Sequence, residues 1–214
     1  MVIKIDDETK KMIKEIFKKL RNDVKIYHFR PVEKECRYCD DTIGLLKTLS
    51  NLSGNRIRVV ELTEKSPEAE KYNIDKFQAI LLHGVEEYNI RFFGIPVGYE
   101  FGALIEDIVD VSLGRVELPP DIINKVKSIK KSVDIKVFVT PTCPYCPLAV
   151  RAAHKYAILN LNITSSMVEC IEFPKLAEKY NVYAVPKIVI NDKVEFEGVV
   201  PDKIFIEYIL KAIK

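Results

Sequence analysis

Hydrophobic positions along the chain follow two periodicities, one helical and one strand-like. In the segment 9–20, Met12, Ile13, Ile16 and Phe17 fall on one face of a helix because they recur at three- and four-residue spacing. The segment 24–29 is instead rich in β-branched and aromatic residues, as strands are. Over the whole chain these patterns predict the order αβαβαββα, and they predict it twice. The expected helices cover 9–20, 39–51, a segment from about 67, 101–111, 121–131, 146–160, a segment from about 174 and 202–212, and the expected strands cover 24–29, 57–62, 79–83, 90–93, 135–140, 165–171, 187–191 and 194–197.

The two halves share short phrases as well as pattern. Ala-Glu-Lys-Tyr-Asn stands at 69–73 and again at 177–181, each time in the short helix before the third strand. Between the halves, the segment 114–120 reads Gly-Arg-Val-Glu-Leu-Pro-Pro, and glycine and proline are typical of a joint that ends one helix and starts another. The repeat predicts two domains, residues 1–117 and residues 118–214.

Composition narrows the function classes. The 214 residues suffice for two domains of about 100 each, with 48% hydrophobic residues to form their cores. The net charge of +2 is too balanced for a nucleic-acid-binding surface. No signal-peptide core stands at the N-terminus, and no segment approaches the roughly 20 apolar residues of a membrane span. We therefore expect a cytoplasmic protein whose partners include neither nucleic acid nor membrane.

Four of the five cysteines form two Cys-x-x-Cys motifs, Cys36-Arg-Tyr-Cys39 and Cys143-Pro-Tyr-Cys146, roughly one hundred residues apart. Each motif follows a predicted strand and leads into a predicted helix. Unpaired backbone N–H groups at a helix N-terminus stabilise a thiolate, and the second cysteine lies one turn further on, where it can resolve a mixed disulfide. The sequence thus predicts two redox-active dithiols, with Cys36 and Cys143 attacking and Cys39 and Cys146 resolving.

The arrangement resembles a known family. A Cys-x-x-Cys motif after a first strand, followed by Val185-Pro186 before a later strand, resembles the thioredoxin fold, in which that proline is usually cis and its neighbouring backbone pairs with substrate. The tandem repeat and the segment 91–101 resemble the archaeal and hyperthermophilic protein disulfide oxidoreductases, also called glutaredoxin-like. The resemblance implies an α/β fold of two tandem thioredoxin-like domains, each a mixed central sheet flanked by helices. The two sheets would be either continuous or packed against one another.

The same resemblance implies an enzyme that reduces, oxidises or isomerises protein disulfides without a bound cofactor or metal. It implies protein disulfide or dithiol substrates, a thioredoxin-reductase-like flavoprotein as electron donor, and a peroxiredoxin as a further partner. Within the repeat, Gln78 stands opposite Pro186, so the first half lacks the usual proline. A non-proline cis peptide costs about 2.5–4 kcal/mol, and we therefore expect the Phe77–Gln78 peptide to be trans. We also expect a reshaped groove at the first site and most substrate exchange at the second.

Two other classes of function remain open. The two cysteine pairs could bind one zinc ion or form purely structural disulfides, although zinc-ribbon pairs usually lie about 15–20 residues apart and a Cys-x-x-Cys loop is short. The chain could also be a binding protein that uses its grooves without turnover.

Several further residues are candidates with simpler interpretations beside them. Cys170 is predicted to be a buried, inert thiol within a core strand rather than a third redox partner. Glu61 and Glu169 are expected at equivalent positions of the second strands, as proton acceptors near the dithiols or as solvent-facing residues. His28, His83 and His154 have no partner at metal-ligand spacing, and we expect them in surface or half-buried structural roles.

Overall fold

The helices and strands follow the predicted order αβαβαββα in both halves. The structure is a computed structural model that describes residues 5–214, so the first four residues of the predicted first domain lie outside it. The first half contains α1 (Asp7–Phe17), β1 (Val24–Arg30), α2 (Cys39–Leu52), β2 (Ile57–Thr63), α3 (Pro67–Lys71), β3 (Ala79–His83), β4 (Ile90–Phe93) and α4 (Glu100–Leu113). The second half contains α5 (Pro120–Ser128), β5 (Val133–Val139), α6 (Cys146–Leu159), β6 (Ile163–Glu169), α7 (Pro174–Lys179), β7 (Lys187–Ile190), β8 (Val194–Glu197) and α8 (Asp202–Ala212).

Differences from the predicted ranges arise at element ends, where caps and pairing decide. Helix α1 begins at Asp7 because the Asp6 side chain accepts a hydrogen bond of 2.8 Å from the Thr9 N–H, a helix cap that hydrophobic periodicity does not show. Strand β6 lies two residues earlier than expected, since it pairs with β5 from Val133–Ile163 to Val139–Glu169. The prediction that Cys170 lies within this strand is therefore wrong, because the strand ends one residue before it.

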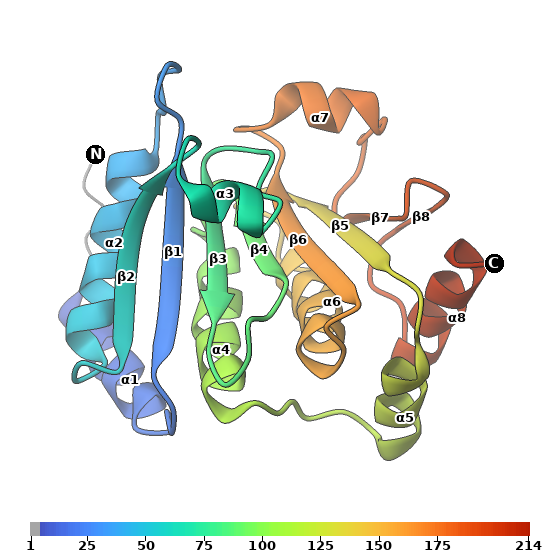
Figure 1. Cartoon of the computed structure of the whole chain (residues 1–214), viewed down its shortest axis with the longest axis horizontal. Helices are drawn as coiled ribbons and strands as arrows, with labels where there is room; N and C mark the ends of the chain where they lie inside the picture. The colour runs from blue at the N-terminus through green and yellow to red at the C-terminus, as the bar shows by residue number, and fades with distance from the viewer. Residues whose placement is uncertain (1–4) are drawn as a thin grey trace.

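All eight strands form one sheet in the order β2-β1-β3-β4-β6-β5-β7-β8 (Figure 1). Within each half, the first strand runs parallel to the second and antiparallel to the third. The halves join where β4 runs parallel to β6, with Ile90 opposite Ser165 and Phe93 opposite Val168. Of the two arrangements that the sequence left open, the structure has the continuous sheet.

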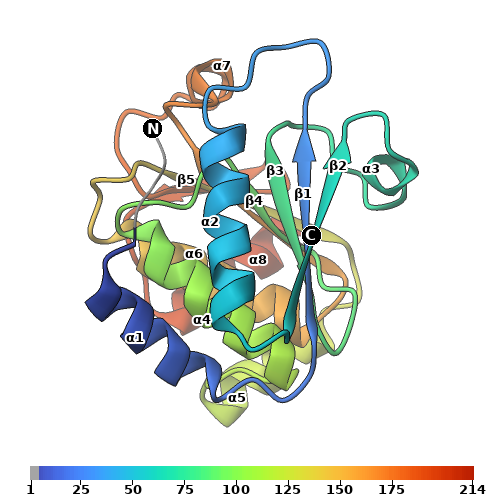
Figure 2. The same cartoon turned by 90° about the vertical axis from the view of Figure 1, so that its left-hand side faces the viewer.

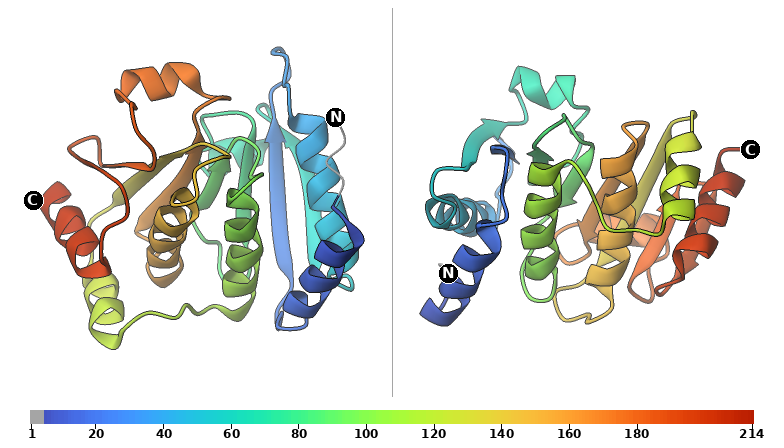
Figure 3. Two further views of the ribbon diagram at one scale, coloured as in Figure 1. Left: turned by 180° about the vertical axis from the view of Figure 1, so that it is seen from behind. Right: turned by 90° about the horizontal axis from the view of Figure 1, so that it is seen from below.

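The two faces of the sheet are covered unequally. Helices α1, α2, α4, α5, α6 and α8 cover one face (Figure 3, left), and their apolar sides bury the larger core together with strand residues such as Ile26 and Val137. The short helix α3 lies toward the other face (Figure 2), and α3 and α7 contribute Ala69 and Leu176 to a smaller core that includes Phe29, Leu81 and Phe138. Because successive strand residues point to opposite faces, every central strand contributes to both cores.

A buried charged cluster joins α4 of the first half to α6 of the second. The Arg151 guanidinium bonds to Asp107 and lies 2.5 Å from Asp110 Oδ2 and 2.9 Å from Glu106 Oε2. The His154 Nδ1 lies 2.6 Å from the other Asp107 oxygen, and the side chains of His154 and Asp107 are fully buried. The two halves thus share a polar helix–helix contact as well as a sheet.

The segment between α4 and α5 contains the predicted domain boundary after residue 117, which stays a prediction. The cap Gly114 ends α4 in the left-handed conformation at φ 64°, as the sequence suggested for the joint. Within residues 5–214, no helix combines the length and the apolar character that crossing a membrane requires.

Candidate active sites

Both Cys-x-x-Cys motifs are closed as disulfides at the start of a helix. Cys39 opens α2 and Cys146 opens α6, and the two Cα atoms of each pair are 5.5 Å apart. Cys39 and Cys146 are fully buried, whereas Cys36 is half-buried and Cys143 is 8% exposed. The first cysteine of each pair is the more accessible one, which fits its predicted role as the attacking thiol.

At the second site, the structure brings Val185 and Pro186 to the disulfide, and their role in a substrate groove stays a prediction. The Val185–Pro186 peptide is cis, and the Val185 carbonyl oxygen lies 3.6 Å from Cys143 Sγ. The Cys146 backbone N–H donates to Cys143 Sγ at 3.2 Å. A thiolate formed on Cys143 would therefore receive a hydrogen bond from the helix N-terminus, which lowers the free energy of its charged form.

Exposed aromatic and aliphatic side chains flank this second site in the sequence. Tyr145 lies inside the motif and is 65% exposed, and Tyr183, two residues before Val185, is 88% exposed. Leu148 on α6 is exposed as well, and so is Tyr99 of the first half, whose backbone N–H donates to the Pro141 carbonyl oxygen at 3.2 Å. Large exposed apolar side chains around a reactive disulfide are typical of a protein-docking surface.

At the first site, the expectation of a trans Phe77–Gln78 peptide is wrong, because this peptide is cis. The preference of an isolated non-proline peptide for trans does not decide the isomer at this position. In the fold, β3 pairs with β1 as β7 pairs with β5, with Ala79 opposite Phe29 and Lys187 opposite Phe138. The first half thus repeats the backbone course of the second, with Gln78 in the place of Pro186.

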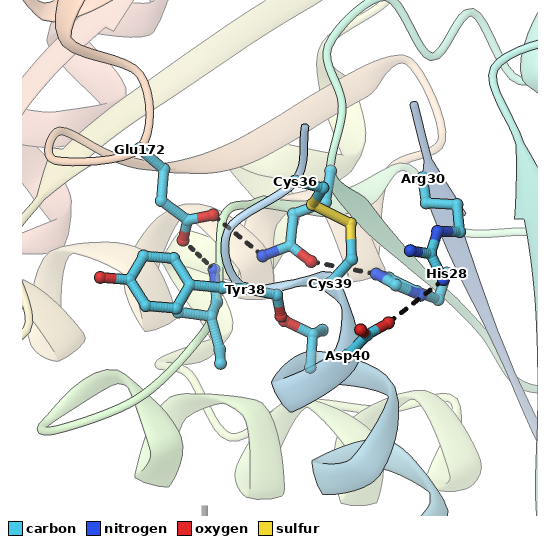
Figure 4. The surroundings of a disulfide bond; sticks show 10 residues. His28, Arg30, Cys36, Tyr38, Cys39, Asp40 and Glu172 are labelled. Atoms are coloured by element: carbon cyan, nitrogen blue, oxygen red, sulfur yellow. Dashed lines mark hydrogen bonds and ion pairs between the residues drawn. A yellow bond between two sulfur atoms is a disulfide. The ribbon is translucent and has the colours of Figure 1, made fainter. Parts of the chain in front are cut away.

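Gln78 is buried within a chain of hydrogen bonds that begins in the first half and ends on a second-half carboxylate (Figure 4). Its Oε1 lies 3.0 Å from His28 Nε2, and its amide nitrogen donates to Glu172 Oε2 at 2.9 Å. The other Glu172 oxygen accepts from the Ile95 backbone N–H at 2.5 Å. His28 and Glu172 both lie among the residues around the Cys36–Cys39 disulfide in Figure 4.

A cleft of about 690 Å³ opens beside Cys36, and both halves line it. The first half contributes Cys36, Tyr38, Phe77 and Gln78, and the second half contributes residues 171–176. A segment of the second half thus forms one wall of this cleft, and the reshaping of the first groove stays a prediction.

Two charged side chains near the first site, Arg37 and Glu33, contact other side chains. Arg37 lies over the Tyr38 ring, 5.1 Å from its centre, and Glu33 pairs with Lys65 at 2.8 Å. Burial lowers the pKa of His28, which favours a neutral ring. Burial also raises the pKa of Glu172, against the opposing effect of its hydrogen bonds from Ile95 and Gln78.

Sequence reasoning missed two carboxyl groups, half-buried Glu172 and fully enclosed Glu100. Glu100 is the first residue of α4, directly after Tyr99, and is 1% exposed. Neither of its carboxyl oxygens has a hydrogen-bond partner among residues 5–214, and burial, together with the nearby charge of Asp107, raises its pKa to about 8. A glutamate at a helix start is normally a surface residue, so no local signal could have identified it.

The predicted equivalence of Glu61 and Glu169 is wrong by two residues. Pairing places Glu61 opposite His28 and Glu169 opposite Val139, so the counterpart of Glu169 is Thr63. Glu61 is exposed and pairs with Lys47 at 2.6 Å. Glu169 is buried and accepts the backbone N–H groups of the following turn, while burial raises its pKa.

The remaining candidates are the free cysteine and the three histidines. The free thiol of Cys170 is half-buried, and burial raises its pKa to about 11. His28, His83 and His154 are all buried, so the expectation of surface or half-buried positions is wrong. Among residues 5–214, no group of three or more His, Cys, Asp or Glu side chains is arranged to hold a metal ion.

Both halves have the same arrangement of strand, disulfide and cis peptide. Twice, a strand leads to a Cys-x-x-Cys disulfide at a helix start, and a cis peptide precedes the third strand of the same half. This arrangement, in one continuous mixed sheet flanked by helices, is a tandem thioredoxin fold. A sequence profile of the thioredoxin domain matches residues 133–211.

Similarity to solved structures extends over nearly the whole chain. The protein disulfide oxidoreductase from Aeropyrum pernix superposes with a TM-score of 0.88 at 29% identity, covering 97% of this chain and 93% of that one. The N-terminal domain of alkyl hydroperoxide reductase AhpF from Enterococcus faecalis has the same TM-score at 23% identity, covering 96% of this chain and 100% of that one. At this level of identity, the similarity shows that the two proteins share a fold. The fold that the resemblance implied is confirmed: the chain has a tandem thioredoxin fold with a Cys-x-x-Cys disulfide in each half, and it is similar to the disulfide oxidoreductase from Aeropyrum pernix.

Curated relatives match a smaller part of the chain. The alkyl hydroperoxide reductase AhpF from Staphylococcus aureus (strain Mu50) is 35% identical over 106 residues, which are 50% of this chain and 20% of the relative. The same protein from Staphylococcus epidermidis is 30% identical over 153 residues, which are 71% of this chain and 28% of the relative. The chain therefore matches only between 20% and 28% of the length of these relatives.

Proposed function

We propose that this protein exchanges disulfides with protein substrates mainly through Cys143 and Cys146. The observation that carries the proposal is the position of Cys143 Sγ, 3.6 Å from the Val185 carbonyl oxygen, with exposed Tyr145 inside the motif and exposed Tyr183 two residues before Val185 in the sequence. An extended substrate segment could pair with this backbone while its sulfur approaches Cys143. The half-buried Cys36 is the more accessible sulfur, so the ranking of the two sites rests on the docking surface rather than on exposure.

The exchange proceeds in two balanced steps. The Cys143 thiolate attacks one sulfur of a substrate disulfide, and the other substrate sulfur leaves as a thiolate that takes up a proton. The Cys146 thiol then loses its proton and attacks Cys143 Sγ, which releases the second substrate thiol and leaves the Cys143–Cys146 disulfide. The substrate gains two electrons and the protein loses two. The reverse sequence oxidises a substrate dithiol.

The oxidised protein needs two electrons to act again as a reductant. We propose a thioredoxin-reductase-like flavoprotein as their source and a peroxiredoxin as one acceptor. The similarity to alkyl hydroperoxide reductase AhpF supports this proposal, because the name of that protein places it in a peroxide-reducing system. We further propose a cytoplasmic location and a division into domains at residues 1–117 and 118–214.

An insulin-reduction assay with dithiothreitol tests the proposal. We expect the Cys143→Ser/Cys146→Ser variant to lose most of the activity and the Cys36→Ser/Cys39→Ser variant to keep most of it. Cys170→Ser serves as the matched cysteine control, with activity unchanged.

Two results would contradict the proposal. If Cys143→Ser/Cys146→Ser kept most of the activity, the ranking of the sites would be wrong. If the variant lacking all four motif cysteines were as active as the wild type, neither pair would be catalytic, and a structural or metal-binding role would be favoured.

A further inference from the structure

One carboxylate of the second half lies in the cleft of the first site. Glu172 follows β6 by three residues, and its own N–H donates to Glu169 Oε2 at 2.8 Å. The pairing of β4 with β6 brings this turn against the first half, where Glu172 accepts from Ile95 and Gln78. A Cβ added at Gly94 would lie 2.7 Å from Glu172 Oε1, so the approach of the two segments requires glycine there.

The second site has no equivalent neighbour. Strand β8, the counterpart of β4, is the last in the sheet of residues 5–214 and pairs with β7 alone. A cross-half contact of this kind is therefore possible at the first site alone.

Donor and acceptor roles along the chain of bonds are fixed by Glu172. A carboxylate can only accept, so the NH₂ group of Gln78 faces Glu172 and its carbonyl oxygen faces His28. His28 must then carry its proton on Nε2. Its Nδ1 is buried and has no hydrogen-bond partner in the described part of the chain.

We propose that Glu172 is a positioning residue of the first site: it fixes Gln78 beside Cys36 and Cys39, and its negative charge makes their reduction less favourable. Cys36, Gln78 and Glu172 all line the same cleft. A negative charge near a thiol disfavours the thiolate, and a less stable reduced pair is a stronger reductant. The second half thereby adjusts the redox balance of the first.

Other charged groups share this environment and moderate the effect. Positive and negative side chains of the cleft are equal in number, so the field of Glu172 is partly offset and we expect a change of several-fold rather than of orders of magnitude. The charged or titratable groups that line the cleft or contact Glu172 and Gln78, besides the cysteines, are His28, Lys34, Glu35, Arg37, Tyr38, Glu64, Asp75, Lys76, Glu169 and Lys175.

The redox equilibrium of the first pair gives the primary test. In the full chain carrying Cys143→Ser/Cys146→Ser, the Cys36–Cys39 pair is equilibrated with dithiothreitol buffers and the reduced fraction is measured by alkylation and mass spectrometry. We expect Glu172→Gln to shift the equilibrium about threefold to tenfold toward the dithiol, which is about 15–30 mV for a two-electron couple. Glu172→Asp should stay within about twofold of the parent, and so should Glu178→Gln, which removes an exposed carboxylate from α7.

The ring of His28 gives a second readout that concerns positioning itself. In Glu172→Gln, the new amide can keep the Ile95 bond with its oxygen, but its NH₂ group would then face the NH₂ group of Gln78. Gln78 is expected to rotate, so that His28 must accept with Nε2 and carry its proton on Nδ1. Nitrogen-15 NMR of the histidine rings distinguishes the two tautomers, with His83 and His154 as unchanged internal references.

Each combination of the two readouts has a definite meaning. A shifted equilibrium together with a switched His28 tautomer supports the proposal. An equilibrium within twofold of the parent overturns it, and so does a shifted equilibrium with an unchanged tautomer, because Glu172 would then not be the residue that fixes the orientation of Gln78. The inference rests on the proposed exchange chemistry, yet both readouts need no protein substrate, so a failure of insulin reduction by the wild type would refute the function separately.

Discussion

The buried carboxyl of Glu100 predicts a specific pH dependence of stability. Its side chain is 1% exposed, and no hydrogen bond from residues 5–214 reaches either oxygen. Desolvation penalises the charged form, and the nearby carboxylate of Asp107 adds to this, so the pKa of Glu100 rises from 4.5 to about 8. We predict that Glu100→Gln abolishes the part of the pH dependence that this proton carries.

Proton linkage sets the sign of this dependence. The folded protein keeps the Glu100 proton up to about pH 8, whereas the unfolded chain loses it near pH 4.5. Between these values the folded state binds the extra proton, so the free energy of unfolding falls as the pH rises. Each pH unit corresponds to about 1.4 kcal/mol, and the interval from 4.5 to about 8 therefore corresponds to at most about 5 kcal/mol. Above pH 8 no further loss is expected from this group.

Guanidinium unfolding of the oxidised protein at pH 5, 6.5, 8 and 9.5 measures the effect. Glu100→Gln leaves a buried amide without partners, which costs about 1–3 kcal/mol at every pH. The variant should therefore be less stable than the wild type at pH 5 and should gain on it steadily up to about pH 8. Glu207→Gln, an exposed carboxylate on α8, should run parallel to the wild type. A difference between Glu100→Gln and the wild type that stays constant within about 1 kcal/mol from pH 5 to pH 9.5 would refute the reasoning.

Three further predictions concern the contact between the halves and the free thiol. Asp107→Ala leaves buried Arg151 without the Asp107 carboxylate and should lower the free energy of unfolding by about 3–5 kcal/mol. The Glu106 side chain is 67% exposed, so Glu106→Ala should lower it by about 1 kcal/mol or less. Equal losses in the two variants would contradict this prediction. Gly98→Ala should lower the free energy of unfolding by about 1–3 kcal/mol and slow insulin reduction, because the φ of Gly98 is 63° and an added Cβ would lie 2.2 Å from the Pro141 oxygen. Gly102→Ala is the control: an added Cβ there meets nothing within 4 Å, so the variant should stabilise α4 by up to about 1 kcal/mol. Melting curves of the two variants measure the difference. Cys170 should resist iodoacetamide at pH 8 in the folded oxidised protein, because at its pKa of about 11 roughly one thiol in a thousand is ionised; labelling as fast as in guanidinium would overturn this.

Much of the fold was predictable because its information is local. Hydrophobic periodicity identifies the helices and strands, and the repetition of that pattern identifies two similar halves. The positions of Cys36 and Cys143 before helix starts follow from the same pattern, and the structure places the Val185 carbonyl oxygen 3.6 Å from Cys143 Sγ. Each of these signals spans only a few residues, and each depends on side-chain spacing or backbone preference.

Errors arose where distant segments decide a local detail. The register of β6 against β5 set the strand two residues earlier, which moved Cys170 out of it and broke the supposed match of Glu61 with Glu169. The Phe77–Gln78 peptide adopts the same course as its counterpart because β3 pairs with β1 in the same register. The intrinsic cis–trans preference of a single peptide gives no information about how its strand pairs with a distant strand.

The sequence alone determines the class of chemistry, because it contains two dithiols at predicted helix starts in a duplicated α/β chain. That the two sheets are continuous emerges only when the chain is folded, and this continuity makes the two sites unequal. The parallel pairing of β4 with β6 places Glu172 against Gln78, 94 residues away in the chain, and the packing of α4 on α6 buries the Arg151 cluster between the halves. Such contacts depend on burial and hydrogen-bond geometry between distant segments, and no local pattern of residues records which segments will meet.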